Sequence, residues 1–126
     1  ILIDLKEEFG PKVEIILGEI PPQRFDPKAF RSVMYNLIEN GVKYNNKSNK
    51  IIKIYTENNA IIVEDNGKGI HQKYFDKIIQ PFQRLDSNTK GTGLGLGIVN
   101  KLIELHNYKL TIESELEKGS KFKILT

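Results

Sequence analysis

The chain has 126 residues, of which 39% are hydrophobic, and this length suits one compact domain with a single core. Its 19 basic and 16 acidic residues are interleaved and leave a net charge of only +3, so no continuous basic surface indicates nucleic-acid binding. Zero cysteines exclude disulfides and thiolate metal sites, and no apolar run reaches the ~20 residues that span a bilayer. We therefore expect a soluble, cytoplasmic segment without direct membrane contact, whether its parent protein is soluble or membrane-anchored.

The N-terminal third predicts a short helix, a strand and a long helix. Residues 2–9 have a helical pattern that a Gly-Pro pair ends, and residues 12–20 alternate as a strand before two prolines. Asp26 is a good N-cap, with Pro27 at the first helical position. The apolar residues after it recur at helical spacing, which predicts an amphipathic helix to about Tyr44.

The rest of the chain alternates between strands and helices. Residues 50–65 predict two strands around a turn at residues 57–59. Residues 83–93 have no core-forming period, which is typical of a mobile loop. The other expected elements are a short helix at 72–79, a second long helix at 94–107, and two closing strands at 108–114 and 120–126.

Three polar residues on the first long helix suggest a ligand site. Asn36, Asn40 and Lys43 follow one another at helical spacing and share one face. A carboxamide oxygen is a hard, neutral ligand that suits Mg²⁺, and a lysine beside it can hold phosphate. Taken alone, such a face is more often the solvated side of an amphipathic helix. The motifs that follow favour the ligand interpretation.

Asp65 ends an apolar strand and is followed by Asn66-Gly67-Lys68-Gly69. A carboxylate held there can accept a hydrogen bond from the exocyclic amino group of adenine. The plain alternative is an aspartate that caps its own turn.

Glycines cluster again between residues 91 and 97, directly before a predicted helix whose N-terminal N–H groups favour anions such as phosphate. A flexible loop would explain Gly91 and Gly93. It does not explain Gly95 and Gly97, which lie inside the helix and cost ~1 kcal/mol each relative to alanine unless close packing or a ligand requires them.

In this order the segments NLIENGVKY, DNGKGI, PFQRL and GTGLGLG resemble the N, G1, F and G2 boxes of the histidine kinase ATP-binding domain, in the GHKL superfamily. The resemblance covers residues 1–126 as one domain. It implies an α/β Bergerat fold, an α+β two-layer sandwich in which a mixed sheet has helices on one face. The nucleotide would lie between the helices under a lid at about residues 82–93. The FQRL wording resembles the phytochrome-like branch of histidine kinases.

The resemblance also implies roles for individual residues. Asn40 would ligate Mg²⁺ with Asn36 beside it, and Lys43 and Arg84 would act on the phosphates. The residues expected to hold ATP are Asn40, Lys43, Tyr44, Asp65, Gly67, Gly69, Ile70, Phe82, Gly91, Thr92, Gly93, Leu94, Gly95 and Leu96.

The departures from the family pattern are few. Gly41 stands where alanine is usual, Gly97 where alanine or serine is usual, and residues 106–108 replace a common HGG. None of them is expected to touch the site directly. Glu39 is usual for the family, but it is rotated away from the Asn40 face and is assigned no role.

Asn36 indicates the reaction type. The hydrolytic relatives, type II topoisomerase and mismatch-repair ATPases, have a glutamate at this position that activates water, whereas an amide has no useful proton affinity. Transfer of the γ-phosphoryl group therefore fits better than hydrolysis. The resemblance implies that the acceptor is a histidine on a dimerisation domain of the same protein, with a response regulator downstream.

Two other functions remain open from the sequence. One is a serine-directed protein kinase of the anti-sigma type, and the other is a degenerate nucleotide-binding module that acts by docking to partners. His71 and His106 lie outside any helical phosphoacceptor pattern, so we expect both to be surface or helix-end residues.

Overall fold

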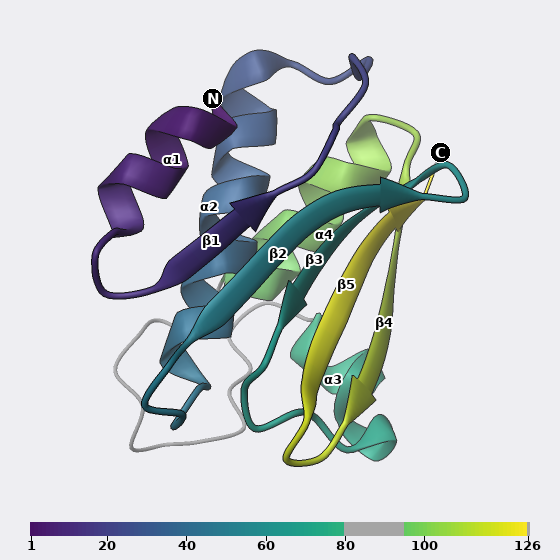
Figure 1. Cartoon of the computed structure of the whole chain (residues 1–126). Coiled ribbons are helices and arrows are strands. Elements are labelled where there is room, and N and C mark those ends of the chain that lie inside the picture. The colour runs from purple at the N-terminus through teal and green to yellow at the C-terminus, as the bar shows by residue number, and fades with distance from the viewer. Residues whose placement is uncertain (80–94, 126) are drawn as a thin grey trace.

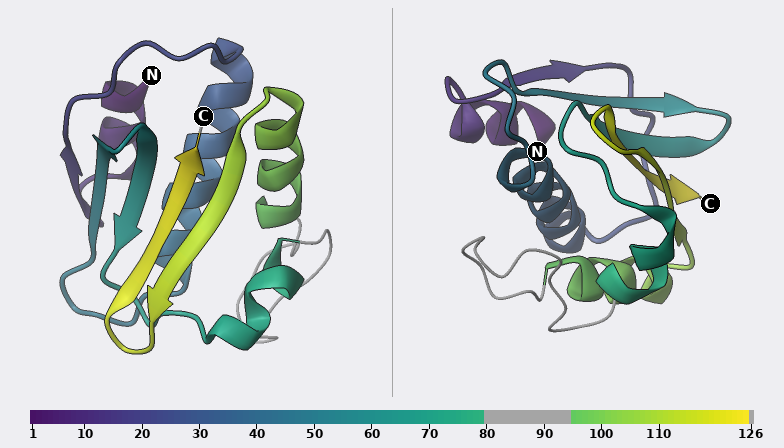
Figure 2. Two further views of the ribbon diagram at one scale, coloured as in Figure 1. Left: turned by 90° about the vertical axis from the view of Figure 1, so that its right-hand side faces the viewer. Right: turned by 90° about the horizontal axis from the view of Figure 1, so that it is seen from below.

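The structure is a computed structural model that describes residues 1–79 and 95–125. A twisted five-stranded sheet forms one layer, and the two longest helices, α2 and α4, pack on one of its faces (Figures 1 and 2). The elements in chain order are α1 (Leu2–Phe9), β1 (Glu14–Leu17), α2 (Pro27–Lys43), β2 (Ile51–Glu57), β3 (Ala60–Asp65), η1 (Gln72–Tyr74), α3 (Phe75–Ile78), α4 (Gly95–Leu105), β4 (Lys109–Glu115) and β5 (Gly119–Leu125). The expected mixed sheet with helices on one face is confirmed.

The strand order is β1-β2-β3-β5-β4, with β1 parallel to β2 and the other neighbours antiparallel. Asn58 and Asn59 both adopt positive φ, 51° and 64°, and join β2 to β3 in the tight hairpin that the sequence predicts. Asn107, with φ of 65°, ends the turn after α4 in the left-handed conformation.

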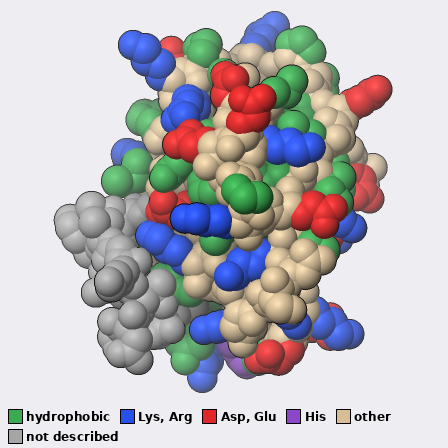
Figure 3. Space-filling model, turned by 60° about the vertical axis from the view of Figure 1, so that its left-hand side comes forward, with side chains coloured by type: hydrophobic (Ala, Val, Ile, Leu, Met, Phe, Trp, Pro, Cys, Tyr) green, Lys and Arg blue, Asp and Glu red, His purple; other side chains and the backbone are tan. Residues whose placement is uncertain are grey.

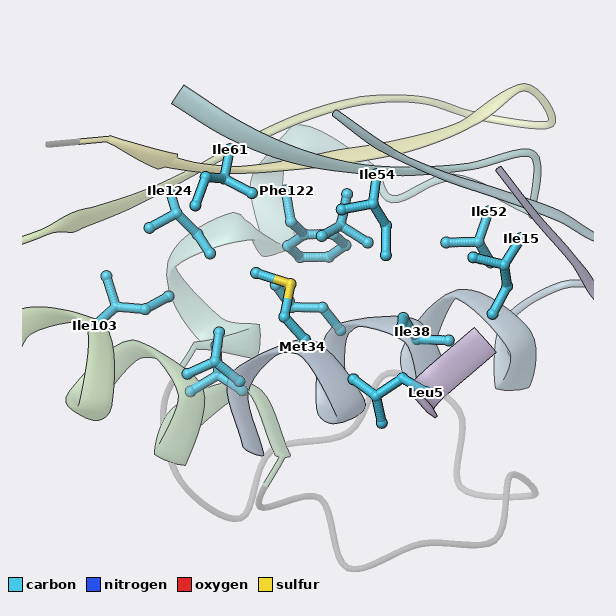
Figure 4. Close-up of a cluster of buried hydrophobic side chains, with 14 of the residues drawn as sticks. Leu5, Ile15, Met34, Ile38, Ile52, Ile54, Ile61, Ile103, Phe122 and Ile124 are labelled. Carbon is cyan, nitrogen blue, oxygen red and sulfur yellow. The ribbon is translucent and has the colours of Figure 1, made fainter. Parts of the chain in front are cut away.

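The core lies between the sheet and the helices (Figure 4). Met34 and Ile38 of α2 point toward the sheet, where Phe122 and Ile54 face them. Because successive strand residues point to opposite faces, the apolar residues of β2 and β5 alternate with polar ones that face away from the helices.

Two expected elements differ in detail. The predicted strand at residues 12–20 is paired only over Glu14–Leu17, and the predicted helix at 72–79 is a 3₁₀ turn, η1, followed by the single turn α3. The predicted loop at 83–93 lies outside the described residues. The bounds of the other elements differ from prediction by a few residues at most.

The surface carries charges of both signs. Figure 3 shows basic and acidic side chains interleaved over one face, as the composition predicts. Among the described residues, no helix is long and apolar enough to cross a membrane.

The start of α2 depends on Asp26. Its Oδ2 accepts a hydrogen bond of 3.0 Å from the backbone N–H of Ala29, and Pro27 occupies the first turn. We expect Asp26→Ala to lower the free energy of unfolding by about 1 kcal/mol, because the N–H loses its acceptor. Asp26→Ser is the control, since serine can restore the cap. Urea denaturation measures both variants, and equal losses for the two would contradict the capping role.

Candidate functional site

The amides of Asn36 and Asn40 are held in one orientation by their own helix. Asn36 Nδ2 donates to the carbonyl oxygen of Ser32 at 2.7 Å, and Asn40 Nδ2 donates to that of Asn36 at 2.8 Å. Only an NH₂ group can donate these bonds, so they fix which end of each amide is which. Among residues 1–79 and 95–125 neither Oδ1 atom has a hydrogen-bond partner, so both can coordinate a cation, as the Mg²⁺ prediction requires.

Lys43 lies one turn beyond this pair and is held by Glu39. The Lys43 Nζ is 3.0 Å from Glu39 Oε1. Tyr35 stands one turn earlier, and a hydrogen bond with Glu39, together with the charge of that carboxylate, raises the pKa of Tyr35. Glu39 therefore interacts with both of its helical neighbours.

The end of α2 is tied to the turn that follows β3. The carbonyl oxygen of Tyr44 accepts a 3.0 Å hydrogen bond from the N–H of Lys68. Asn45, which is 5% exposed, donates to Asn66 Oδ1 at 2.8 Å, and the same oxygen accepts from the N–H of Ile51 at 2.9 Å. The segments that resemble the N and G1 boxes are thus joined by a hydrogen bond between backbone groups and by one between amide side chains.

Two glycines of this turn are required by close approach. A Cβ on Gly67 would lie 2.7 Å from the carbonyl oxygen of Tyr44. Gly69 has φ of 75°, and a Cβ there would lie 2.2 Å from the carbonyl oxygen of Glu115. Any side chain at either position would push the turn away from α2 or from the β4–β5 connection.

Asp65 places a partly buried carboxylate at this junction. Burial raises its pKa to about 6, and hydrogen bonds from the backbone of Gly67 and Ser120 oppose that rise. Its Oδ1 accepts from the N–H of Gly67 at 2.9 Å, so the aspartate does cap its own turn. The other oxygen, Oδ2, lies toward Gly41 of α2. An amino group of a ligand could donate a hydrogen bond to it from that side.

Gly41 corrects one expectation. A Cβ at Gly41 would lie 3.1 Å from Asp65 Cβ, 3.5 Å from Asp65 Oδ2 and 2.6 Å from Ile52 Cδ1. This departure from the family pattern therefore does touch the site, contrary to prediction. The end of the Ile52 side chain occupies the space that an alanine methyl group would need.

Three residues that sequence reasoning missed support the site. Ser114 Oγ accepts a 2.7 Å bond from the N–H of Ile70 and lies 2.9 Å from Ser120 Oγ. Asn45 could have been noticed because it directly follows Tyr44. Neither serine has a sequence signal, since only the register of β4 on β5 brings them to Ile70.

The described residues cover part of the predicted site. Gly95 begins α4, and Leu96 packs against the core. The predicted residues Phe82, Arg84, Gly91, Thr92, Gly93 and Leu94, and the lid, lie outside the described residues.

The two histidines have structural roles, as expected. His71 Nδ1 accepts from the N–H of Lys73 at 3.1 Å and caps η1. His106 stacks on Phe25 with 4.1 Å between ring centroids, and its Nδ1 lies 2.8 Å from the carbonyl oxygen of Leu102.

A pocket of about 330 Å³ opens next to the end of β3, and its lining includes Glu64, Glu113 and Lys121. By the register of the sheet these three side chains face away from the helices. The pocket shares Asp65, Ser114 and Ser120 with the candidate site, but its lining among the described residues includes none from α2, so it lies beside the helix face that carries the amides.

Comparison with known proteins agrees with this geometry. Residues 25–126 match the family described as histidine kinase-, DNA gyrase B-, and HSP90-like ATPase. The chain is 41% identical over 124 residues to cyanobacterial phytochrome B of Nostoc sp. (strain PCC 7120), a match that covers 92% of this chain and 16% of that protein. The chain spans about a sixth of the length of the curated relatives it matches first.

Two solved structures have the same fold. The catalytic domain of histidine kinase ThkA has a TM-score of 0.76 and 23% identity over 98% of this chain and 87% of that one. Full-length ShkA in complex with AMPPNP has a TM-score of 0.77 and 22% identity over 98% of this chain and 28% of that one. The chain therefore belongs to the family of histidine kinase-, DNA gyrase B- and HSP90-like ATPases, and the expected histidine-kinase-type ATP-binding domain is confirmed.

Proposed function

We propose that this chain binds Mg-ATP and donates the γ-phosphoryl group to a histidine on a separate dimerisation and phosphoacceptor domain of the same protein, from which a cytoplasmic response regulator receives it. One arrangement carries the proposal. Two amides on α2 present Oδ1 atoms that bond to no other group in the described part of the chain, and the partly buried carboxylate of Asp65 lies beside the same helix at Gly41.

Asp65 is proposed to bind the adenine. The exocyclic amino group of adenine donates hydrogen bonds, and a carboxylate is a stronger acceptor for it than a neutral oxygen. Gly67 leaves room beside this carboxylate that any side chain would fill. Gly69 and Ile70 are proposed to complete this end of the pocket through the backbone of the turn.

Asn40 and Asn36 are proposed to hold Mg²⁺, because both present amide oxygens and neither amide is free to turn its NH₂ group outward. The described residues contain no group of three or more His, Cys, Asp or Glu side chains that could hold a metal ion. Phosphate and water oxygens would therefore complete the coordination, and the ion supplies neutralisation of phosphate charge. Lys43, with Arg84 and Gly91 to Gly95, is proposed to bind the phosphates.

The amide at position 36 supports transfer over hydrolysis. Its NH₂ group is already bonded to the carbonyl oxygen of Ser32, and the amide cannot take a proton from water. Acceptance by histidine rather than serine is supported by the names of the relatives, among them the signal transduction histidine-protein kinase ArlS of Staphylococcus aureus.

The first prediction concerns the affinity for adenine nucleotides. Asp65→Asn should weaken ATP binding by about 1.5 to 3 kcal/mol, the worth of a charged hydrogen bond. In the wild type the affinity should also fall as the pH drops below about 6, because the Asp65 carboxylate becomes protonated. Calorimetry from pH 5 to 8 tests both points, with the Asn variant as the correction for titration of the phosphates. Identical pH profiles for the two proteins would remove Asp65 from the site.

The same substitution should stabilise the nucleotide-free chain. The pKa of Asp65 is higher in the folded state, about 6 against 3.8, so its contribution to stability is complete below pH 3.8 and is lost as the pH rises through 6. At pH 7.5 we expect Asp65→Asn to raise the free energy of unfolding by about 1 to 3 kcal/mol, at 1.4 kcal/mol per pKa unit. Urea denaturation at pH 4 and pH 7.5 measures this, and a gain of the same size at both pH values would contradict it.

The proposed metal site predicts that one substitution removes only the Mg²⁺-dependent part of the ATP affinity. Asn40→Ala should abolish most of the difference between ATP affinity with Mg²⁺ and with EDTA, because the Oδ1 ligand is gone, while binding in EDTA changes little. Asn100→Ala on α4 is a control, since Asn100 bonds only to the exposed Glu104 in the described part of the chain. An unchanged Mg²⁺ effect in Asn40→Ala would place the metal elsewhere.

Transfer and hydrolysis can be separated with γ-labelled ATP. The chain alone should stay unlabelled and should show no appreciable turnover, because it has neither a water-activating carboxylate at position 36 nor a helical phosphoacceptor histidine. Supplying the phosphoacceptor domain in trans should label that domain. The label should be acid-labile, as phosphohistidine is. An acid-stable product would indicate a serine kinase, and steady hydrolysis by the chain alone would indicate an ATPase.

A further inference from the structure

A row of side chains on α2 leads to the phosphate end of the site. Tyr35, Glu39 and Lys43 are four residues apart, so they meet along one side of the helix. Glu39 Oε1 is 3.0 Å from the Lys43 ammonium, and Glu39 also forms a hydrogen bond with Tyr35. At the other end, the Tyr35 ring packs on Phe9 of α1 with 5.2 Å between centroids.

We infer that Glu39 is a positioning residue that holds the Lys43 ammonium at the phosphate end of the pocket. This inference rests on the proposed function, in which Lys43 binds the phosphates. It gives a role to a residue that the sequence leaves without one.

Glu39 can hold Lys43 without using all of its hydrogen-bond donors. An ammonium group has three N–H donors, and the bond to one carboxylate oxygen leaves two for phosphate. Lysine is also a point charge on a flexible four-carbon stem, so its position depends on what holds the charged end.

Partial burial shields this pair from solvent more than an open surface pair. The Lys43 and Glu39 side chains are 35% and 33% exposed, whereas the Arg31–Glu8 pair near the start of the same helix is 47% exposed on both sides. Solvent screens the more exposed pair more strongly. Because Glu8 and Arg31 both lie near Tyr35, the matched control is Glu113→Gln, which removes the ion pair with Lys123 on the sheet face that points away from the helices.

Glu39→Gln is the direct test, because glutamine keeps the size of the side chain and removes its charge. At saturating Mg-ATP we expect the rate of histidine phosphorylation in the parent protein to fall about three- to tenfold, since transfer depends on how the phosphate is held. ATP affinity should change less than about twofold, because the lost hold on Lys43 and the lost repulsion between Glu39 and phosphate oppose each other. Glu113→Gln should not change the rate.

A double-mutant cycle shows whether Glu39 acts through Lys43. In a Lys43→Ala background, Glu39→Gln should have no further effect on the rate. A loss of the same factor in both backgrounds, or no loss in the wild-type background, would overturn the inference. If the wild type neither binds Mg-ATP nor transfers phosphate, the proposed function itself is wrong. If the wild type is active and Glu39→Gln is equally active, only the inference about Glu39 is wrong.

A readout without nucleotide completes the test. In ¹⁵N NMR at low temperature the Lys43 ammonium, assigned by its loss in Lys43→Arg, should exchange with water more slowly in the wild type than in Glu39→Gln. The ammonium of Lys118, which pairs with Glu115 at 72% and 68% exposure, is the internal reference. Equal exchange of the Lys43 ammonium in the two proteins would show that Glu39 does not hold it.

Discussion

The close approach of the turn at Gly67 to the end of α2, where the N–H of Lys68 donates to the carbonyl oxygen of Tyr44, holds the two halves of the site together. α2 brings the amides and Lys43, and β3 brings Asp65, which is 22 residues beyond Lys43 in the chain. The absence of a side chain at Gly67 lets the turn reach the end of α2, where the Lys68 N–H and the Asn45 amide bond across the junction. The position of Asp65 relative to Asn40 follows from this approach.

The position of Asp65 at this junction also explains why its charged carboxylate destabilises the nucleotide-free domain. Asp65 lies where the end of β3 meets α2, and burial there disfavours its charged form more than the two backbone N–H groups favour it. A ligand that donates a further hydrogen bond to the carboxylate would offset part of the free-energy cost of burying its charge. The site is therefore less stable than an apolar packing of the same residues would be, which is common where stability and function compete.

The sequence predicts the fold well because its strongest signals are local. Asp26 and Pro27 define the start of α2, and the Asn58-Asn59 pair defines the β2–β3 turn, so both elements are found where expected. Contacts that depend on register are not local. Nothing in the sequence indicates that Ser114 meets the N–H of Ile70, or that Gly41 faces Asp65, because both contacts arise only when β4 pairs with β5 and α2 packs on β3. The predicted strand at 12–20 was too long because alternation of apolar residues continues beyond the part of it that finds a partner in β2.

The close approach of Gly41 and Ile52 links two positions that the family pattern treats separately. An alanine at 41 needs the volume that Ile52 Cδ1 fills, so the usual family residue fits this chain only if position 52 becomes shorter or turns its side chain away. Sequences of this fold are therefore expected to vary at the two positions together, as a pair of compensating volumes. A change to the family consensus at position 41 alone would force the end of the Ile52 side chain to move from the wall behind Asp65, although each residue by itself is an ordinary choice for its element.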